Sequence, residues 1–192
     1  MDDLTAVEET ELIERARRGD GVAFGELARR HAGAALRVAQ VMTGGSAEAE
    51  DVVQEAMLKA YRALDRFRAE SPLRPWLLRI VANEARNRRR SIGRRTRLHE
   101  RVGAMTAPLV ARPSVETLAV ADDGARRLLA AVGRLRDQDR EVIAMRYFAD
   151  LSEAEMADAL GVARGTVKSR LARALDRLRP RVAALDLEEG AP

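Results

Sequence analysis

The stretch from Leu151 to Arg179, LSEAEMADALGVARGTVKSRLARALDRLR, predicts a short helix, a tight turn and a longer second helix. Ser152 stands three residues before Glu155, the spacing of a capping box that satisfies free backbone donors where a helix starts. Gly161 follows the short helix and supplies the turn. One face of the second helix is apolar at three- and four-residue steps: Val167, Leu171, Ala174, Leu175 and Leu178.

The opposite face of the second helix carries small and basic side chains, which include Thr166, Ser169 and Arg173. A helix-turn-helix that reads DNA needs this arrangement, because the apolar stripe anchors the helix while its early residues reach base edges and phosphates in the major groove. A plain amphipathic hairpin with a solvated charged face fits the pattern as well. The pattern by itself therefore leaves both interpretations open.

Composition predicts an all-α protein. The 192 residues are 46% hydrophobic but only 3% aromatic, so the cores must be built from Leu, Val, Ile and Ala. Cysteine is absent, and His31 and His99 lack metal-ligand spacing, so we expect neither a metal nor a cofactor. No apolar run approaches the ~20 residues of a membrane span, and the acidic start does not resemble a signal peptide. We therefore expect a cytoplasmic protein.

The basic residues of the chain are almost all arginine. Formal net charge is +4 and the sequence pI is about 10.2. Arginine binds phosphate and base edges well, but codon bias in a GC-rich genome explains most of its abundance. The placement of the arginines is therefore more informative than their number.

Three regions separate along the chain. Residues 8–91 are helical in pattern and end in a dense basic run, with helices expected over 11–18 and 22–42. Residues 92–120 contain Gly93, Gly103, Pro108 and Pro113 and read as a flexible linker. Residues 121–184 are helical again, and the tail is expected to fray. We predict two small helical domains, the second containing the helix-turn-helix.

An acidic stripe marks the segment that follows the break at Thr43–Ser46. Glu48, Asp51 and Glu55 stand three and four residues apart with Gln54 beside them, and Ser46 is expected to cap the helix. Favourable placement near a helix N-terminus explains Glu48 and Asp51 better than Glu55. A binding stripe for a basic partner is equally consistent with the pattern.

A Trp and an arginine cluster share the next helix, RPWLLRIVANEARNRRR over residues 74–90, where Pro75 suits the first turn. Trp76 lies at its start, and the run ends in Arg86, Arg88, Arg89 and Arg90. Aromatic rings that stack on bases, next to guanidinium groups that bind phosphates, are typical of single-stranded nucleic-acid sites. A buried core Trp with a solvated basic helix end is at least as consistent.

Three segments in order resemble an extracytoplasmic-function (ECF) sigma factor, the two-domain branch of the sigma-70 family of bacterial RNA polymerase. AEDVVQEAMLKAYRALDRF (49–67) is similar to the family's polymerase-binding helix, and the Trp76 helix is similar to its −10 reader. DREVIAMRYFADLSEAEMADALGVARGTVKSRLARALDRLR (139–179) is similar to its −35 reader. The resemblance implies a non-enzymatic initiation factor whose partners are core RNA polymerase, promoter DNA and an anti-sigma factor.

The resemblance also implies a role for each matching residue. Asp51, Gln54 and Glu55 would contact the basic coiled-coil clamp of the largest polymerase subunits. Trp76 and Asn83 would help to separate the strands, and the loop over residues 69–74 would hold an extruded base. The phosphate-tracking residues would be Arg86, Arg88, Arg89 and Arg90. The −35 contacts would come from Arg164, Thr166, Lys168, Ser169, Arg170 and Arg173.

Two departures and two rival interpretations remain. Met57 replaces a usual aromatic residue, and Arg136 replaces a usual proline, which leaves Asp137 to cap the following helix. A stand-alone helix-turn-helix regulator would leave the acidic stripe and the Trp76 region unexplained. A nuclease or nucleotide-dependent enzyme would need a GxxxxGK loop, a histidine–carboxylate metal cluster or an activated nucleophile, and the sequence offers none.

Overall fold

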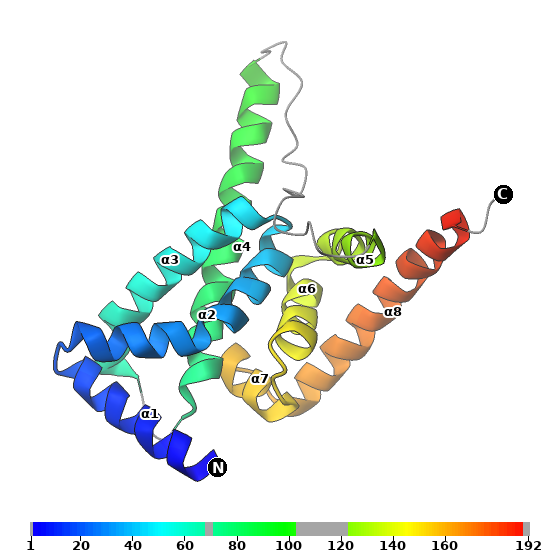
Figure 1. The fold of residues 1–192 in the computed structure, drawn as a ribbon. Helices are drawn as coiled ribbons and strands as arrows, with labels where there is room; N and C mark the ends of the chain where they lie inside the picture. Colours follow the sequence, from blue (N-terminus) through cyan, green and yellow to red (C-terminus); the bar gives the residue numbers. More distant parts are fainter. Residues whose placement is uncertain (1, 68–70, 103–122, 190–192) are drawn as a thin grey trace.

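The computed structural model describes residues 2–67, 71–102 and 123–189, and within these ranges every regular element is a helix (Figure 1). The all-α prediction is confirmed. The N-terminal half contains α1 (Asp2–Arg17), α2 (Gly21–Thr43), α3 (Ser46–Ala63), a 3-10 turn η1 (Leu64–Arg66) and α4 (Leu73–Val102). The C-terminal half contains α5 (Asp123–Gly133), α6 (Asp137–Ile143), a π-helical turn η3 (Ala144–Phe148), α7 (Glu153–Leu160) and α8 (Arg164–Glu189).

Helices α2, α3 and α4 pack against one another, and α1 lies against α2. Their contacts use small residues, because Ala35, Ala39, Ala56 and Ala82 are completely buried and allow close approach of the helix axes. Asp20 caps α2 by accepting hydrogen bonds from the next backbone amides. The far end of α4 projects beyond the body of the molecule (Figure 1).

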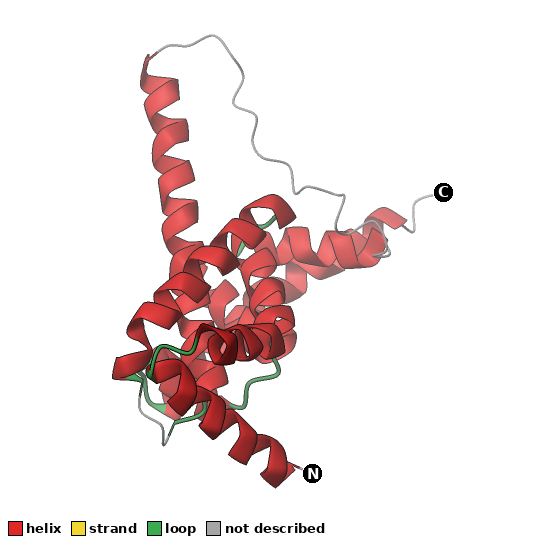
Figure 2. Ribbon diagram, turned by 60° about the vertical axis from the view of Figure 1, so that its left-hand side comes forward, coloured by secondary structure: helices red, strands yellow, loops and turns green. Residues whose placement is uncertain are grey.

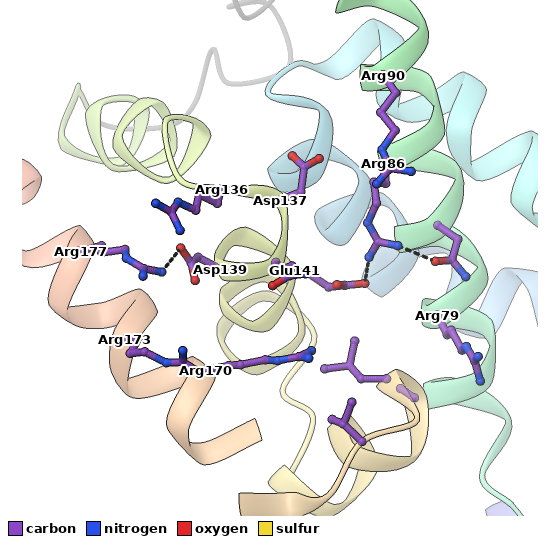
Figure 3. Close-up of a pocket in the computed structure, with 15 residues that line it drawn as sticks. Arg79, Arg86, Arg90, Arg136, Asp137, Asp139, Glu141, Arg170, Arg173 and Arg177 are labelled. Carbon is purple, nitrogen blue, oxygen red and sulfur yellow. Dashed lines mark hydrogen bonds and ion pairs between the residues drawn. The ribbon is translucent and has the colours of Figure 1, made fainter. Parts of the chain in front are cut away.

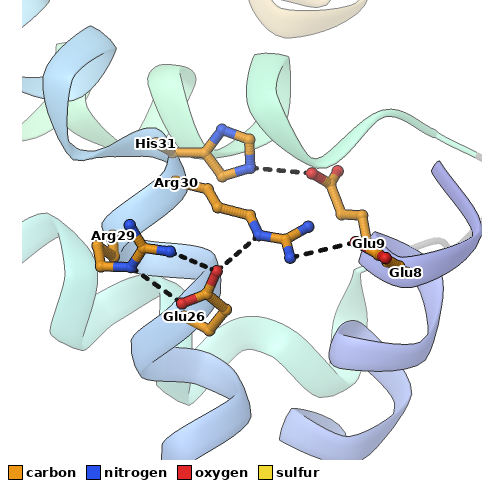
Figure 4. A network of polar contacts seen from close by, with 6 residues as sticks. All are labelled: Glu8, Glu9, Glu26, Arg29, Arg30 and His31. Carbon is orange, nitrogen blue, oxygen red and sulfur yellow. Dashed lines mark hydrogen bonds and ion pairs between the residues drawn. The ribbon is translucent and has the colours of Figure 1, made fainter. Parts of the chain in front are cut away.

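Polar contacts fasten α1 to α2 (Figure 4). Arg30 donates to Glu26 at 2.9 Å and lies 3.6 Å from Glu8. Hydrogen bonds from Arg29 and then Arg30 lower the pKa of Glu26 to about 2. His31 of α2 is buried, with its Nε2 3.3 Å from a carboxylate oxygen of Glu9 in α1.

The helix-turn-helix forms as the sequence predicts. The Ser152 hydroxyl accepts from the Glu155 amide at 3.2 Å, and the Glu155 carboxylate accepts from the Ser152 amide at 2.8 Å, so the capping box is complete. Gly161 ends α7 in the left-handed conformation with φ of 64°. Val167 and Ala174 of the predicted stripe are fully buried.

Several predicted helix ends differ from the structure. Gly45, not Ser46, is the residue before α3, and no side chain caps that helix. Asp137 is the first residue of α6 rather than its cap, because its carboxylate pairs with Arg89 at 2.5 Å. Helix α4 starts at Leu73 and continues through residues 92–102 of the expected linker. Residues 103–122 lie outside the described residues, so the domain boundaries stay predictions.

The two halves share one large apolar core, and a second, smaller core lies within the N-terminal half. Buried side chains of α2 and α4, such as Val38 and Val81, belong to the same cluster as Val142, Met145 and Met156 of the C-terminal half. Helix α2 contacts α5, α6 and η3, and α4 contacts α7. Figure 1 shows α5 to α8 beside α2 and α4, and Figure 2 shows from a second direction that the described elements are helices joined by loops.

One buried arginine joins the halves. Arg140 of α6 is 1% exposed, and its guanidinium donates to the Met42 carbonyl at 2.9 Å, in the last turn of α2. It also donates to the carbonyls of Val132 at 3.3 Å, Leu135 at 2.9 Å and Gly133, around the end of α5. The last carbonyls of a helix have no partner within it, so Arg140 supplies donors to two helix ends together and places a cation where both helix dipoles favour one.

We expect Arg140→Met to lower the free energy of unfolding by about 3 kcal/mol or more, because several buried carbonyls lose their donor together. Urea unfolding followed by circular dichroism measures the loss. Arg134→Met, an exposed position in the turn between α5 and α6, is the matched control and should stay within about 0.5 kcal/mol of the parent protein. Equal stability of the two variants would contradict this role for Arg140.

Candidate polymerase and nucleic-acid interfaces

The acidic stripe lies on the outer face of α3, where Arg88 of α4 and Lys59 of α3 itself are its basic partners. Arg88 donates to Glu48 and, at 3.0 Å, to Asp51. Lys59 lies 3.4 Å from Glu55 and 2.6 Å from Glu84. The side chains of Asp51 and Glu55 nevertheless remain 63% and 51% exposed, so a further basic surface could still reach them. The stripe therefore has partners within the chain that the sequence did not reveal.

Trp76 lines a small cavity between the two halves. Its ring packs on Phe67 with centroids 5.0 Å apart and planes tilted by 52°. The cavity has a volume of about 240 Å³, and its wall includes Pro72 and Arg79 from the N-terminal half and Asp158 from α7. Trp76 is thus a half-buried ring beside a cavity rather than a fully buried core residue. Of the predicted base-holding loop, 71–74 are described and 69–70 are not.

The four arginines at 86–90 do not form one continuous phosphate-tracking row. Arg86 donates to Asn83 at 2.9 Å and pairs with Glu141 of α6. Arg88 turns to the acidic stripe, as described above, and Arg89 bonds Asp137 of α6. Arg90 lines a cleft that also contains Asn83 and Arg86. The structure therefore brings Asn83, Arg86 and Arg90 together and separates Arg88 from them.

Some of the predicted −35 contact residues of α8 are exposed to solvent, and others line the cleft that contains Arg90. Arg164, Lys168 and Ser169 are exposed at the start of the helix. Arg170 and Arg173 line the cleft, and Arg173 donates to the Ser169 carbonyl at 3.0 Å. Thr166 is partly exposed, and its carbonyl accepts from the Ser169 hydroxyl at 3.1 Å.

The cleft between the halves has a volume of about 690 Å³ and is strongly charged (Figure 3). We call it the arginine cleft. Its arginines are Arg79, Arg86, Arg90, Arg136, Arg170, Arg173 and Arg177, and its carboxylates are Asp137, Asp139 and Glu141. Arg177 pairs with Asp139 at 2.6 Å, and Arg86 pairs with Glu141. The cleft therefore contains residues from both predicted DNA-reading sets.

Glu141 is one of two buried carboxylates of the cleft, the other being Asp139. Burial raises the pKa of Glu141 above the ordinary value, against the opposing effect of the neighbouring Arg86. A carboxyl whose pKa is raised on folding contributes most to the stability of the folded state when it is protonated. That stabilisation is lost as the pH rises through its folded-state pKa. The ionised form of Glu141 is thus held at a net cost despite its arginine partner.

Sequence reasoning did not predict which side chains connect the halves: these are Asp137, Arg140, Glu141, Arg37 and Arg74. Arg37 donates to the Phe148 carbonyl at 2.8 Å and Arg74 to the Ala149 carbonyl at 2.6 Å, both at the end of η3. A signal for Arg140 was present, since it precedes Ile143 and Ala144 at helical spacing on an apolar face. No local pattern identifies the partners of Arg37 or Arg74.

Other kinds of site find no support in the described ranges. No group of three or more histidine, aspartate and glutamate side chains there could hold a metal ion. Among those same residues, no helix is long and apolar enough to cross a membrane.

Comparison with known proteins identifies both halves. The family model for Sigma-70 region 2 matches residues 27–95, and that for Sigma-70, region 4 matches residues 125–178. The chain is 36% identical over 170 residues to the ECF RNA polymerase sigma factor SigM of Mycobacterium tuberculosis, covering 88% of this chain and 82% of the relative.

Two solved structures share the fold. CnrH in complex with the cytosolic domain of CnrY aligns with a TM-score of 0.68 at 28% identity, over 96% of this chain and 99% of CnrH. RpoE of Bartonella quintana, in complex with the anti-sigma factor NepR, aligns with a TM-score of 0.58 at 28% identity, over 78% of this chain and 90% of RpoE. With both regions matched in order and the SigM likeness extending over most of each chain, the protein belongs to the ECF branch of the sigma-70 family of RNA polymerase sigma factors.

Proposed function

We propose that this sigma factor recruits core RNA polymerase through α3 and directs it to promoters through α4 and α8. Asp51, Gln54 and Glu55 dock on the polymerase clamp, the Trp76–Arg90 segment opens the −10 element, and the start of α8 grips the −35 element. The observation that carries the proposal is the coexistence of an exposed acidic face on α3 and a completely capped helix-turn-helix in one chain.

The polymerase contact rests on charge and exposure. Surface ion pairs contribute little free energy in water, about 0–1 kcal/mol. The contacts of Arg88 and Lys59 with the stripe can therefore exchange for contacts with a basic partner at small cost. A partner that covers the stripe would also exclude water and strengthen each remaining charge pair.

The DNA contacts rest on the position of α8. Its apolar stripe is buried against α6 and α7, so its first two turns are held as a rigid reading edge. Lys168 and Ser169 are exposed there. In the −10 region, the cavity beside Trp76 joins an aromatic ring to Arg66 and Arg79, a combination suited to an unstacked base and its phosphate.

The proposal includes a regulator and a compartment. RpoE of Bartonella quintana forms a complex with an anti-sigma factor, and we propose that a protein of this class holds the present chain inactive. The site of action is the cytoplasm, where polymerase and promoters meet. The chain itself carries out no covalent chemistry and acts through binding alone.

Charge reversal in the acidic stripe tests the polymerase contact. We expect Asp51→Arg and Glu55→Arg each to weaken binding to purified core polymerase by about tenfold or more, because a repulsive charge replaces an attractive one. Binding is measured with a labelled protein, and promoter-directed transcription should fall in parallel. Glu50→Arg, exposed on the same helix but beside the stripe, is the control. Unchanged core binding in both stripe variants would exclude the proposed contact.

Two substitutions in α8 separate base reading from phosphate binding. With holoenzyme and a library of −35 sequences, Arg173→Ala should cost about 1–3 kcal/mol at the preferred sequence and relax specificity at one position. Lys168→Ala should weaken binding evenly across sequences and reduce the salt dependence by about one counterion. Arg179→Ala, on the same helix and 77% exposed, is the control. Identical sequence preferences for the parent and Arg173→Ala would rule out base reading by this residue.

A further inference from the structure

The arginine cleft gathers basic groups from both halves of the molecule. Arg79 and Arg90 come from α4, Arg170 and Arg173 from α8, and Arg136 from the turn before α6 (Figure 3). Arg86 of α4 and Arg170 of α8 point into the cleft from opposite sides (Figure 3). They form one site only because the shared core holds the halves together.

The cleft carries an excess of positive charge. Seven arginines and three carboxylates line it, which leaves a net charge of +4. The described carboxylates pair with Arg86 and Arg177 inside the cleft, and with Arg89 at its edge. Arg79, Arg90 and Arg136 form no ion pair with any described residue. The closed arrangement therefore concentrates like charges that the described part of the chain does not neutralise.

This excess charge favours a multivalent anion. A concave surface lined by one sign of charge focuses its field and attracts counterions. Planar guanidinium groups match the oxygens of a phosphate in bidentate geometry. A volume of about 690 Å³ falls in the range of small-molecule sites, roughly 300–1,000 Å³. The cleft is thus large enough for a chain of phosphates but too small for a DNA duplex.

We propose that the arginine cleft binds one small multiply phosphorylated anion, which bridges α4 to the C-terminal half and holds the halves closed. The shared chemistry is a run of phosphates, as in inorganic tripolyphosphate or in the triphosphate of a nucleotide. An anion that binds the closed form stabilises it by mass action.

One consequence rests on the proposed function. Asn83, Arg170 and Arg173 line the cleft and are also proposed promoter contacts. An anion in the cleft would occupy the same side chains, so it would compete with promoter DNA. The experiments that follow measure ligand binding and unfolding without polymerase or promoter, so their failure would leave the proposed function standing.

The binding test uses the full chain and titration calorimetry at a constant ionic strength of about 0.15 M. Inorganic tripolyphosphate should bind saturably with one site per chain. Arg79→Ala on the α4 side and Arg136→Ala on the α6 side should each weaken binding about tenfold, the effect of losing a charge-assisted contact. Arg136 is not among the proposed promoter contacts, whereas Arg79 also lines the cavity beside Trp76. Arg179→Ala, exposed outside the cleft, should bind within about twofold of the parent.

A second measurement tests whether the anion bridges the halves. Saturating tripolyphosphate should raise the urea concentration at the midpoint of unfolding for the parent protein and for Arg179→Ala. The increase should be much smaller for Arg79→Ala and for Arg136→Ala. The same titration is repeated with a nucleoside triphosphate in the absence of magnesium. Tighter binding than that of tripolyphosphate would identify a nucleotide site, and weaker binding would identify a site for an inorganic polyphosphate.

Three outcomes would overturn the proposal. The first is the absence of saturable binding by either phosphate compound. The second is equal binding by the parent, Arg79→Ala and Arg136→Ala, which would place the anion elsewhere. The third is saturable binding of a short single-stranded oligonucleotide with no binding of either phosphate compound, which would make the cleft part of a nucleic-acid surface.

Discussion

The hydrogen bonds of the Arg140 guanidinium hold the arrangement of the two halves. A charged group can be buried in this way because the carbonyls of two helix ends replace the water that it loses. Helix α6 is thereby fixed to the end of α2, and η3 and the helix-turn-helix follow it in the chain. The apolar core then closes around them, with Val142 and Met145 packed among side chains of α2 and α4. The orientation of α8 toward α4 thus depends on this buried cation.

Closure gives the basic residues two alternative sets of partners. In this arrangement Arg86 and Arg89 bind carboxylates of α6, although guanidinium groups bind phosphate equally well. Glu141 is a poor permanent partner, since burial raises its pKa and its ionised form is held at a cost. The contacts between the halves are therefore of two kinds: the buried hydrogen bonds of Arg140, and ion pairs at the cleft that other partners can replace. The free energy needed to separate the halves comes mainly from the Arg140 hydrogen bonds and the apolar core.

Local rules made the helix-turn-helix predictable from sequence. The capping box at Ser152, the left-handed Gly161 and the spacing of Val167 and Ala174 each depend on residues within a few positions, and all appear in the structure. Capping by Asp137 was predicted wrongly, because a long-range pair with Arg89 takes its carboxylate. The partners of Arg88 and Arg140 likewise come from packing between distant helices, which single-sequence patterns do not encode. The sequence identified the acidic stripe but not that α4 already covers part of it.

The position of Arg88 would link the proposed polymerase docking to the proposed DNA binding. Its guanidinium donates to Glu48 and Asp51, and a clamp that takes up these carboxylates would set it free. A released guanidinium at this place on α4 would gain a phosphate in exchange for the lost carboxylates. By thermodynamic linkage, each event then favours the other by the same factor. Through this one side chain, the protein would bind DNA with high affinity only when it is also bound to core polymerase.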